Sequence, residues 1–165
     1  MNKTQFVILR GRRDSGKTTL CAEVYRQLLH FADKEHLFGK PECSMATVTD
    51  DSIKFDEKGN TCDFQALLTI SNKKVGFFSM GDYVPDFFKI NIHAFIEIDV
   101  DILVCCTRSR IRGNSTFRYI EETYAEYGKT VFWTEYSPQK ESAHIIKQKQ
   151  AEIIVQHILT KLDIQ

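Results

Sequence analysis

Short apolar runs alternate along this chain with longer segments in which apolar residues recur at helical spacing. Compact runs bounded by polar turns predict strands, and apolar residues three or four apart over a longer stretch predict helices. The expected strands lie at residues 6–10, 44–55, 62–70, 75–79, 102–107 and 130–136. The expected helices lie at residues 16–32, 85–98, 115–127 and 141–162, with a loop at residues 33–43.

This alternation is typical of an α/β domain with a mostly parallel sheet. Turn-forming residues at 56–60 and 71–74 separate three of the strands. Because a parallel partner needs a long crossover, strands joined so closely must pair antiparallel. The sequence therefore predicts a mostly parallel sheet with an antiparallel β-hairpin at its edge. With 165 residues, the chain has room for one domain, residues 1–165, and little more.

Residues 11–18 fit the pattern G-x-x-x-x-G-K-[ST]. The two glycines allow a tight turn whose backbone N–H groups point inward at the α- and β-phosphates of a nucleotide. Lys17 is expected to reach the β- and γ-phosphates, and the Thr18 hydroxyl to bind Mg²⁺. The residues expected to contact the nucleotide are Gly11, Asp14, Ser15, Gly16, Lys17, Thr18 and Thr19.

The surroundings of this motif match its use. An apolar run at residues 6–9 comes directly before it, and Leu20, Val24 and Leu28 follow at helical spacing. Strand, glycine loop and helix in this order place a phosphate at the helix N-terminus. The chain therefore resembles the P-loop NTPase superfamily. The resemblance implies a three-layer fold that binds a nucleoside triphosphate, ATP or another NTP, with Mg²⁺.

The acidic residue that usually completes such a metal site is displaced. In this superfamily an apolar strand commonly ends in Asp, but Ser79 stands at that place here. The nearest acid is Asp82, which could reach the metal through water and take part in catalysis. Asp82 could equally cap the helix that begins near Pro85. Both interpretations stay open, and the departure leaves hydrolysis itself in question.

A second group of candidate residues follows the strand at 102–107. Arg108, Arg110 and Arg112 alternate there, and they look like the lid arginines of P-loop kinases, which stabilise charge in the transition state. The alternative is a solvated basic loop. Asp50, with its neighbour Asp51, could orient an attacking hydroxyl or water. For this pair a polar strand-end turn is the favoured interpretation.

Two aromatic residues are also candidates for contact with the nucleotide. Trp133 and Tyr136 could border the nucleotide base, although core packing is the favoured role for Trp133. The five histidines are scattered without ligand spacing, which argues against a metal other than Mg²⁺.

Composition limits the partners. Lys+Arg and Asp+Glu are both 22, so the balance of charge gives no case for nucleic acid or an anionic membrane. The five cysteines form no C-x-x-C pair and indicate neither a disulfide framework nor a zinc ribbon. No signal peptide is expected before the first strand, and a cytoplasmic location is expected.

Three functions fit these observations. The first is an ATPase or NTPase that cleaves the β–γ bond. The second is a P-loop kinase that transfers the γ-phosphate to a small-molecule acceptor, supported by the arginines. The third is a non-catalytic nucleotide-dependent switch or interaction module with a protein partner, supported by Ser79 in place of Asp. No N-K-x-D motif for reading guanine occurs in the sequence, which favours ATP over GTP.

Overall fold

A computed structural model of the chain describes residues 3–13, 15–38, 63–81, 85–109, 115–134 and 140–164. Within these residues, six strands and four helices form a single α/β arrangement. In chain order the elements are β1 (Gln5–Gly11), α1 (Lys17–Leu29), β2 (Lys34–Phe38), β3 (Gln65–Ile70), β4 (Lys73–Phe78), α2 (Pro85–Glu97), β5 (Ile102–Arg108), α3 (Thr116–Thr123), β6 (Lys129–Trp133) and α4 (Lys140–Lys161). The α/β class predicted from the sequence is confirmed.

The described strands form one sheet in the order β2-β3-β4-β5-β1-β6. Three neighbouring pairs run parallel: β4 with β5, β5 with β1, and β1 with β6. The sheet is therefore mostly parallel, as predicted. β3 runs antiparallel to both β2 and β4. The hairpin of β3 and β4 is therefore confirmed, but it does not form the edge, because β2 lies outside it.

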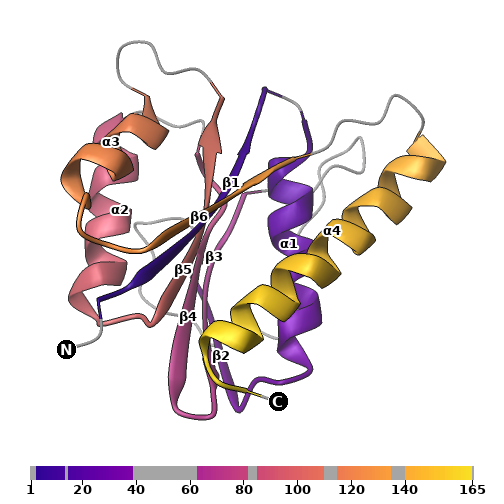
Figure 1. Ribbon diagram of the computed structural model, residues 1–165, viewed down its shortest axis with the longest axis horizontal. Coiled ribbons are helices and arrows are strands. Elements are labelled where there is room, and N and C mark those ends of the chain that lie inside the picture. Colours follow the sequence, from indigo (N-terminus) through magenta and orange to yellow (C-terminus); the bar gives the residue numbers. More distant parts are fainter. Residues whose placement is uncertain are drawn as a thin grey trace.

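Helices cover both faces of the sheet in the view of Figure 1, with α1 and α4 on one side and α2 and α3 on the other. The alternation of side chains along β1 explains the two layers of core. Val7 and Leu9 pack in the core beneath α1 and α4, while Phe6 and Ile8 pack in the core beneath α2 and α3. β5 is buried on both faces from Ile102 to Thr107, which is why it reads as a continuous apolar run.

The predicted loop at residues 33–43 is wrong in part, because residues 34–38 form β2. This strand is mostly polar, and it forms through backbone pairing with β3, in which Lys34 lies opposite Thr69 and Phe38 opposite Gln65. Its sequence carries no apolar alternation, so periodicity could not reveal it. The predicted strand at 44–55 and the turn at 56–60 lie outside the described residues. The turn between β3 and β4 places Ser71 and Asn72 at positive φ, 48° and 65°, as a tight hairpin requires.

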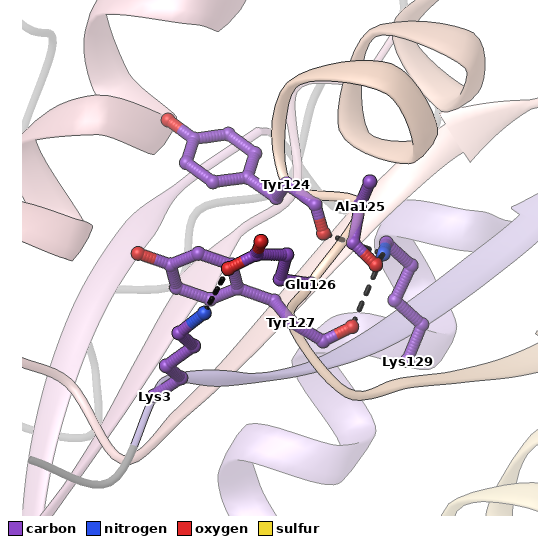
Figure 2. A network of polar contacts seen from close by, with 6 residues as sticks. All are labelled: Lys3, Tyr124, Ala125, Glu126, Tyr127 and Lys129. Atoms are coloured by element: carbon purple, nitrogen blue, oxygen red, sulfur yellow. Dashed lines mark hydrogen bonds and ion pairs between the residues drawn. The ribbon is translucent and has the colours of Figure 1, made fainter.

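A polar network lies at the amino-terminal ends of β1 and β6, and it fixes the connection from α3 to β6 (Figure 2). The ammonium of Lys129 donates to the carbonyls of Tyr124, Tyr127 and Ala125 at 2.6, 3.1 and 3.4 Å. Lys3 pairs with Glu126 beside it. These carbonyls follow α3, which ends at Thr123 rather than at the predicted residue 127. The lysine therefore satisfies acceptors that a longer helix would have used.

The remaining elements match their predicted positions to within a few residues, including α2 from Pro85 and α4 from Lys140. No helix in the described part of the chain is long and apolar enough to cross a membrane.

Gly81 offers a test of how closely the segment after β4 approaches β5. A Cβ at this position would overlap the backbone carbonyl of Cys106, which cannot move without breaking the sheet. We expect Gly81→Ala to lower the free energy of unfolding by about 3 kcal/mol in urea denaturation. Ile90→Ala, at an exposed position of α2, is the control and should change stability little. Equal stability of the two variants would contradict the packing described.

Candidate functional site

The loop between β1 and α1 lies at the carboxyl end of β1, at the top of Figure 1. Gly11 ends the strand, Gly16 is the N-cap residue of the helix, and Lys17 is its first residue. Gly16 has φ 84° and ψ 27°, a left-handed conformation that other residues rarely adopt. A Cβ there would also lie 2.9 Å from Cε of Lys147, which comes from α4. The left-handed backbone conformation therefore favours glycine at position 16, whereas the end of the Lys147 side chain could move aside.

Lys17 folds back over its own loop. Its side chain is buried, and its ammonium donates to the Arg12 carbonyl at 2.8 Å and to the Gly11 carbonyl at 3.3 Å. No acidic residue occupies the first turn of α1. The first N–H groups of a helix lack intrahelical acceptors, and the helix dipole adds positive potential there. A lysine beside such a helix start favours an anionic ligand.

The neighbouring parallel strands hold this loop at both sides. The N–H of Ser109, just past β5, donates to the Gly11 carbonyl at 2.9 Å, and the N–H of Thr134, just past β6, donates to the Arg10 carbonyl at 2.8 Å. In the register of β1 and β5, Gly11 lies opposite Arg108. Arg108 is exposed and lies at the end of β5, beside the loop.

Arg10, the penultimate residue of β1, is a buried cation that sequence analysis did not single out. Its guanidinium carbon lies 3.8 Å from the ring centre of Phe117 and 4.8 Å from that of Trp133. Its Nη2 donates to the Ser109 carbonyl at 3.0 Å, so it also holds the segment after β5. Trp133 is 56 % exposed and covers Arg10 from outside. The favoured prediction of core packing for Trp133 is wrong, because β6 is an edge strand and its last residue stacks on a cation.

An acidic residue does reach the loop, from an unexpected direction. The Thr18 hydroxyl donates to Oδ1 of Asp63 at 2.8 Å, and the Ser79 hydroxyl lies 3.2 Å from the same oxygen. Asp63 precedes β3 by two residues. The sequence predictions considered only residues that follow strands, because parallel strands place those residues at the edge where ligands bind. The hairpin signal at residues 71–74 could have found Asp63, because an antiparallel strand begins where its neighbours end.

Unpartnered polar atoms gather at the same edge of the sheet. Among the described residues, the buried side-chain atoms without a hydrogen-bond partner are Arg10 Nε, Ser15 Oγ, Thr107 Oγ1 and Thr134 Oγ1. Arg10 and Thr107 lie opposite each other near the ends of β1 and β5, Ser15 lies in the loop, and Thr134 follows β6. Buried polar groups in proteins are nearly always paired, and a cluster of exceptions is typical of a site that takes a ligand or water.

The structure thus brings together seven of the predicted site residues: Gly11, Ser15, Gly16, Lys17, Thr18, Thr19 and Arg108. Apart from Trp133, which stacks on Arg10, the others lie outside the described residues: Asp14, Asp50, Asp51, Asp82, Arg110, Arg112 and Tyr136. No group of three or more His, Cys, Asp or Glu residues that could hold a metal ion occurs in the part of the chain described. A Mg²⁺ ion bound with a nucleotide needs only one or two protein ligands, so such a group is not required.

Comparison with known proteins adds no assignment. No protein-family model, curated protein or solved structure matches this chain. The candidate site therefore rests on its own residues.

Three free thiols among the described residues are buried in the two cores of the sheet. Cys21 of α1 and Cys105 and Cys106 of β5 are all fully buried, as the sequence predicted for the β5 pair. The Cys106 thiol donates to the Lys17 carbonyl at 3.5 Å. Burial first, and then the hydrogen bond with Cys106, raises the pKa of the Cys21 thiol, and burial raises the pKa of Cys105.

These thiols should be unreactive in the folded protein. In a Cys43→Ser, Cys62→Ser background, we expect no labelling of the native protein by a thiol-specific disulfide reagent at pH 8, and labelling of three thiols in urea. Because the folded pKa values of Cys21 and Cys105 lie above the unfolded ones, these two neutral thiols contribute stability that is complete below about pH 8.5 and is lost as the pH rises further. Rapid labelling of the native protein would contradict this burial.

Proposed function

We propose that this protein binds Mg²⁺-ATP through residues 11–19 as a P-loop protein and cleaves the β–γ phosphate bond. The observation that carries the proposal is the loop itself. A left-handed Gly16 leads into α1, and the buried Lys17 ammonium lies against the Gly11 and Arg12 carbonyls at the carboxyl edge of a mostly parallel sheet. This is the edge at which open α/β sheets bind ligands.

The charges around the loop suit a triphosphate. Arg12 and Arg13 are exposed within the loop, Arg108 is exposed beside it, and Lys17 begins the helix that follows. In the proposed complex, Lys17 turns its ammonium from the loop carbonyls to the β- and γ-phosphates, and Arg108 contacts the phosphates from the end of β5. The Thr18 hydroxyl would hold Mg²⁺, which neutralises charge on the phosphate oxygens. These interactions position the γ-phosphate for attack by water.

The lysine tests the binding proposal. At Mg²⁺-ATP about 100-fold above its Kd, we expect the melting temperature of the wild type to rise by about 5–10 °C. Lys17→Ala should abolish this rise, because it removes the charge that faces the phosphates. Lys89→Ala, at an exposed lysine of α2, is the matched control and should keep it. A full thermal shift in Lys17→Ala would contradict the proposed role of the loop.

Phosphate release tests the reaction. Purified protein mixed with Mg²⁺-ATP should release inorganic phosphate over many turnovers, and Lys17→Ala should not. If ATP stabilises the fold but no phosphate appears, the hydrolase proposal fails and binding alone remains. Thermal shifts with GTP in parallel test the preference for ATP.

A further inference from the structure

The carboxylate of Asp63 lies where the start of α1 meets the end of β4. Its Oδ1 accepts a hydrogen bond from the Thr18 hydroxyl at 2.8 Å and lies 3.2 Å from the Ser79 hydroxyl. Thr18 is the residue that the proposed function assigns to Mg²⁺. Ser79 stands where an aspartate commonly ends the strand in the superfamily that the chain resembles.

The backbone explains why Asp63 must lie there. β3 is antiparallel to β4, and Gln65 at its start lies opposite Phe78 at the end of β4. One step further along, the N–H of Ser79 donates to the Phe64 carbonyl at 3.1 Å, and the N–H of Phe64 donates to the Ser79 hydroxyl at 2.8 Å. These two hydrogen bonds fix the position of Phe64 relative to Ser79. The residue before Phe64 is therefore held at the carboxyl edge.

We infer that Asp63 supplies the acidic group of the metal site, and that Ser79 is its positioning residue. This inference rests on the proposed function, because the metal concerned is the Mg²⁺ of the bound nucleotide. The carboxylate then comes from the residue just before β3, rather than from Asp82 after β4.

The oxygen atoms present fit the ion. Mg²⁺ takes hard oxygen ligands in an octahedron at 2.0–2.1 Å, so neighbouring ligand oxygens are about 2.9 Å apart. The Thr18 hydroxyl oxygen and Asp63 Oδ1 are separated by 2.8 Å, a spacing that suits two adjacent ligands. Asp63 is also exposed, so that water has access to complete a coordination shell.

Ser79 can orient the carboxylate because its own position is fixed. It is 2 % exposed, and its oxygen already accepts from the Phe64 N–H, which leaves its hydrogen to donate to Asp63 or to the Phe64 carbonyl, each at 3.2 Å. An aspartate at position 79 would supply a carboxylate from the end of β4. Ser79 instead orients the carboxylate of Asp63, which comes from the start of β3. Groups that orient metal ligands in this way commonly change metal affinity by about tenfold or more when removed.

The test is the Mg²⁺ dependence of nucleotide affinity, measured by calorimetry with ATP in MgCl₂ and in EDTA. For the wild type we expect ATP to bind about tenfold more tightly in MgCl₂. Asp63→Asn should remove most of this enhancement while affinity in EDTA is kept or improved, because a negative charge beside the phosphates is gone. Glu121→Gln, an exposed acid on α3, is the matched control and should behave as the wild type.

A double-mutant cycle tests the role given to Ser79. Ser79→Ala should reduce the Mg²⁺ enhancement severalfold in the wild-type background and leave it unchanged in the Asp63→Asn background, because it acts through Asp63. Equal losses in both backgrounds would overturn that role. If Asp63→Asn lowers the melting temperature strongly, Asp63→Glu serves as the second variant, with a reduced enhancement expected because the longer side chain displaces the carboxylate.

The outcomes separate this inference from the proposed function. If the wild type binds ATP and Asp63→Asn keeps the full Mg²⁺ enhancement, the inference is overturned and nucleotide binding stands. If the wild type binds equally well in MgCl₂ and EDTA, the inference is also overturned. If the wild type binds ATP under neither condition, the proposed function fails and the inference fails with it.

Discussion

The parallel pairing of β1 with β5 and β6 is the constraint on which the rest of this structure depends. It brings three strand ends to one edge, where the N–H groups of Ser109 and Thr134 hold the backbone of Arg10 and Gly11. The chain must then leave β1 by a sharp turn and enter α1 through the left-handed Gly16. The helix start, the buried lysine and the unpartnered hydroxyls all meet there because these strands share a direction.

The reversal of β3 changes what this edge contains. In a fully parallel sheet, residues that precede a strand lie at the far end, away from the ligand edge. Because β3 runs the other way, Asp63 lies beside Thr18, and Phe64 locks onto Ser79 through two backbone N–H groups. Ser79 stands where an aspartate was expected, and its hydroxyl contacts both the Phe64 N–H and the Asp63 carboxylate. The hairpin of β3 and β4 therefore brings Asp63, just before β3, to the proposed metal site.

The sequence was sufficient for the features that local patterns determine. The periodicity around Leu20, the continuous apolar run of β5 and the glycines of the loop predicted the α/β class and the loop between β1 and α1. The sequence was insufficient for the features that depend on which strands pair and in which direction. β2 is polar and exists through its ladder with β3, while Trp133 looks like a core residue until its edge position above Arg10 is known. Asp63 was missed because its place depends on strand direction, not on neighbouring residues.

The most direct test of the central claim, that this edge binds Mg²⁺-ATP, is amide hydrogen exchange followed by mass spectrometry. At saturating Mg²⁺-ATP, the account predicts slower exchange in residues 11–19 and around Asp63 and Phe64, because bound phosphates and metal would restrain both segments. Exchange in α3 from Thr116 to Thr123 should change little. Unchanged exchange in residues 11–19 would contradict the account.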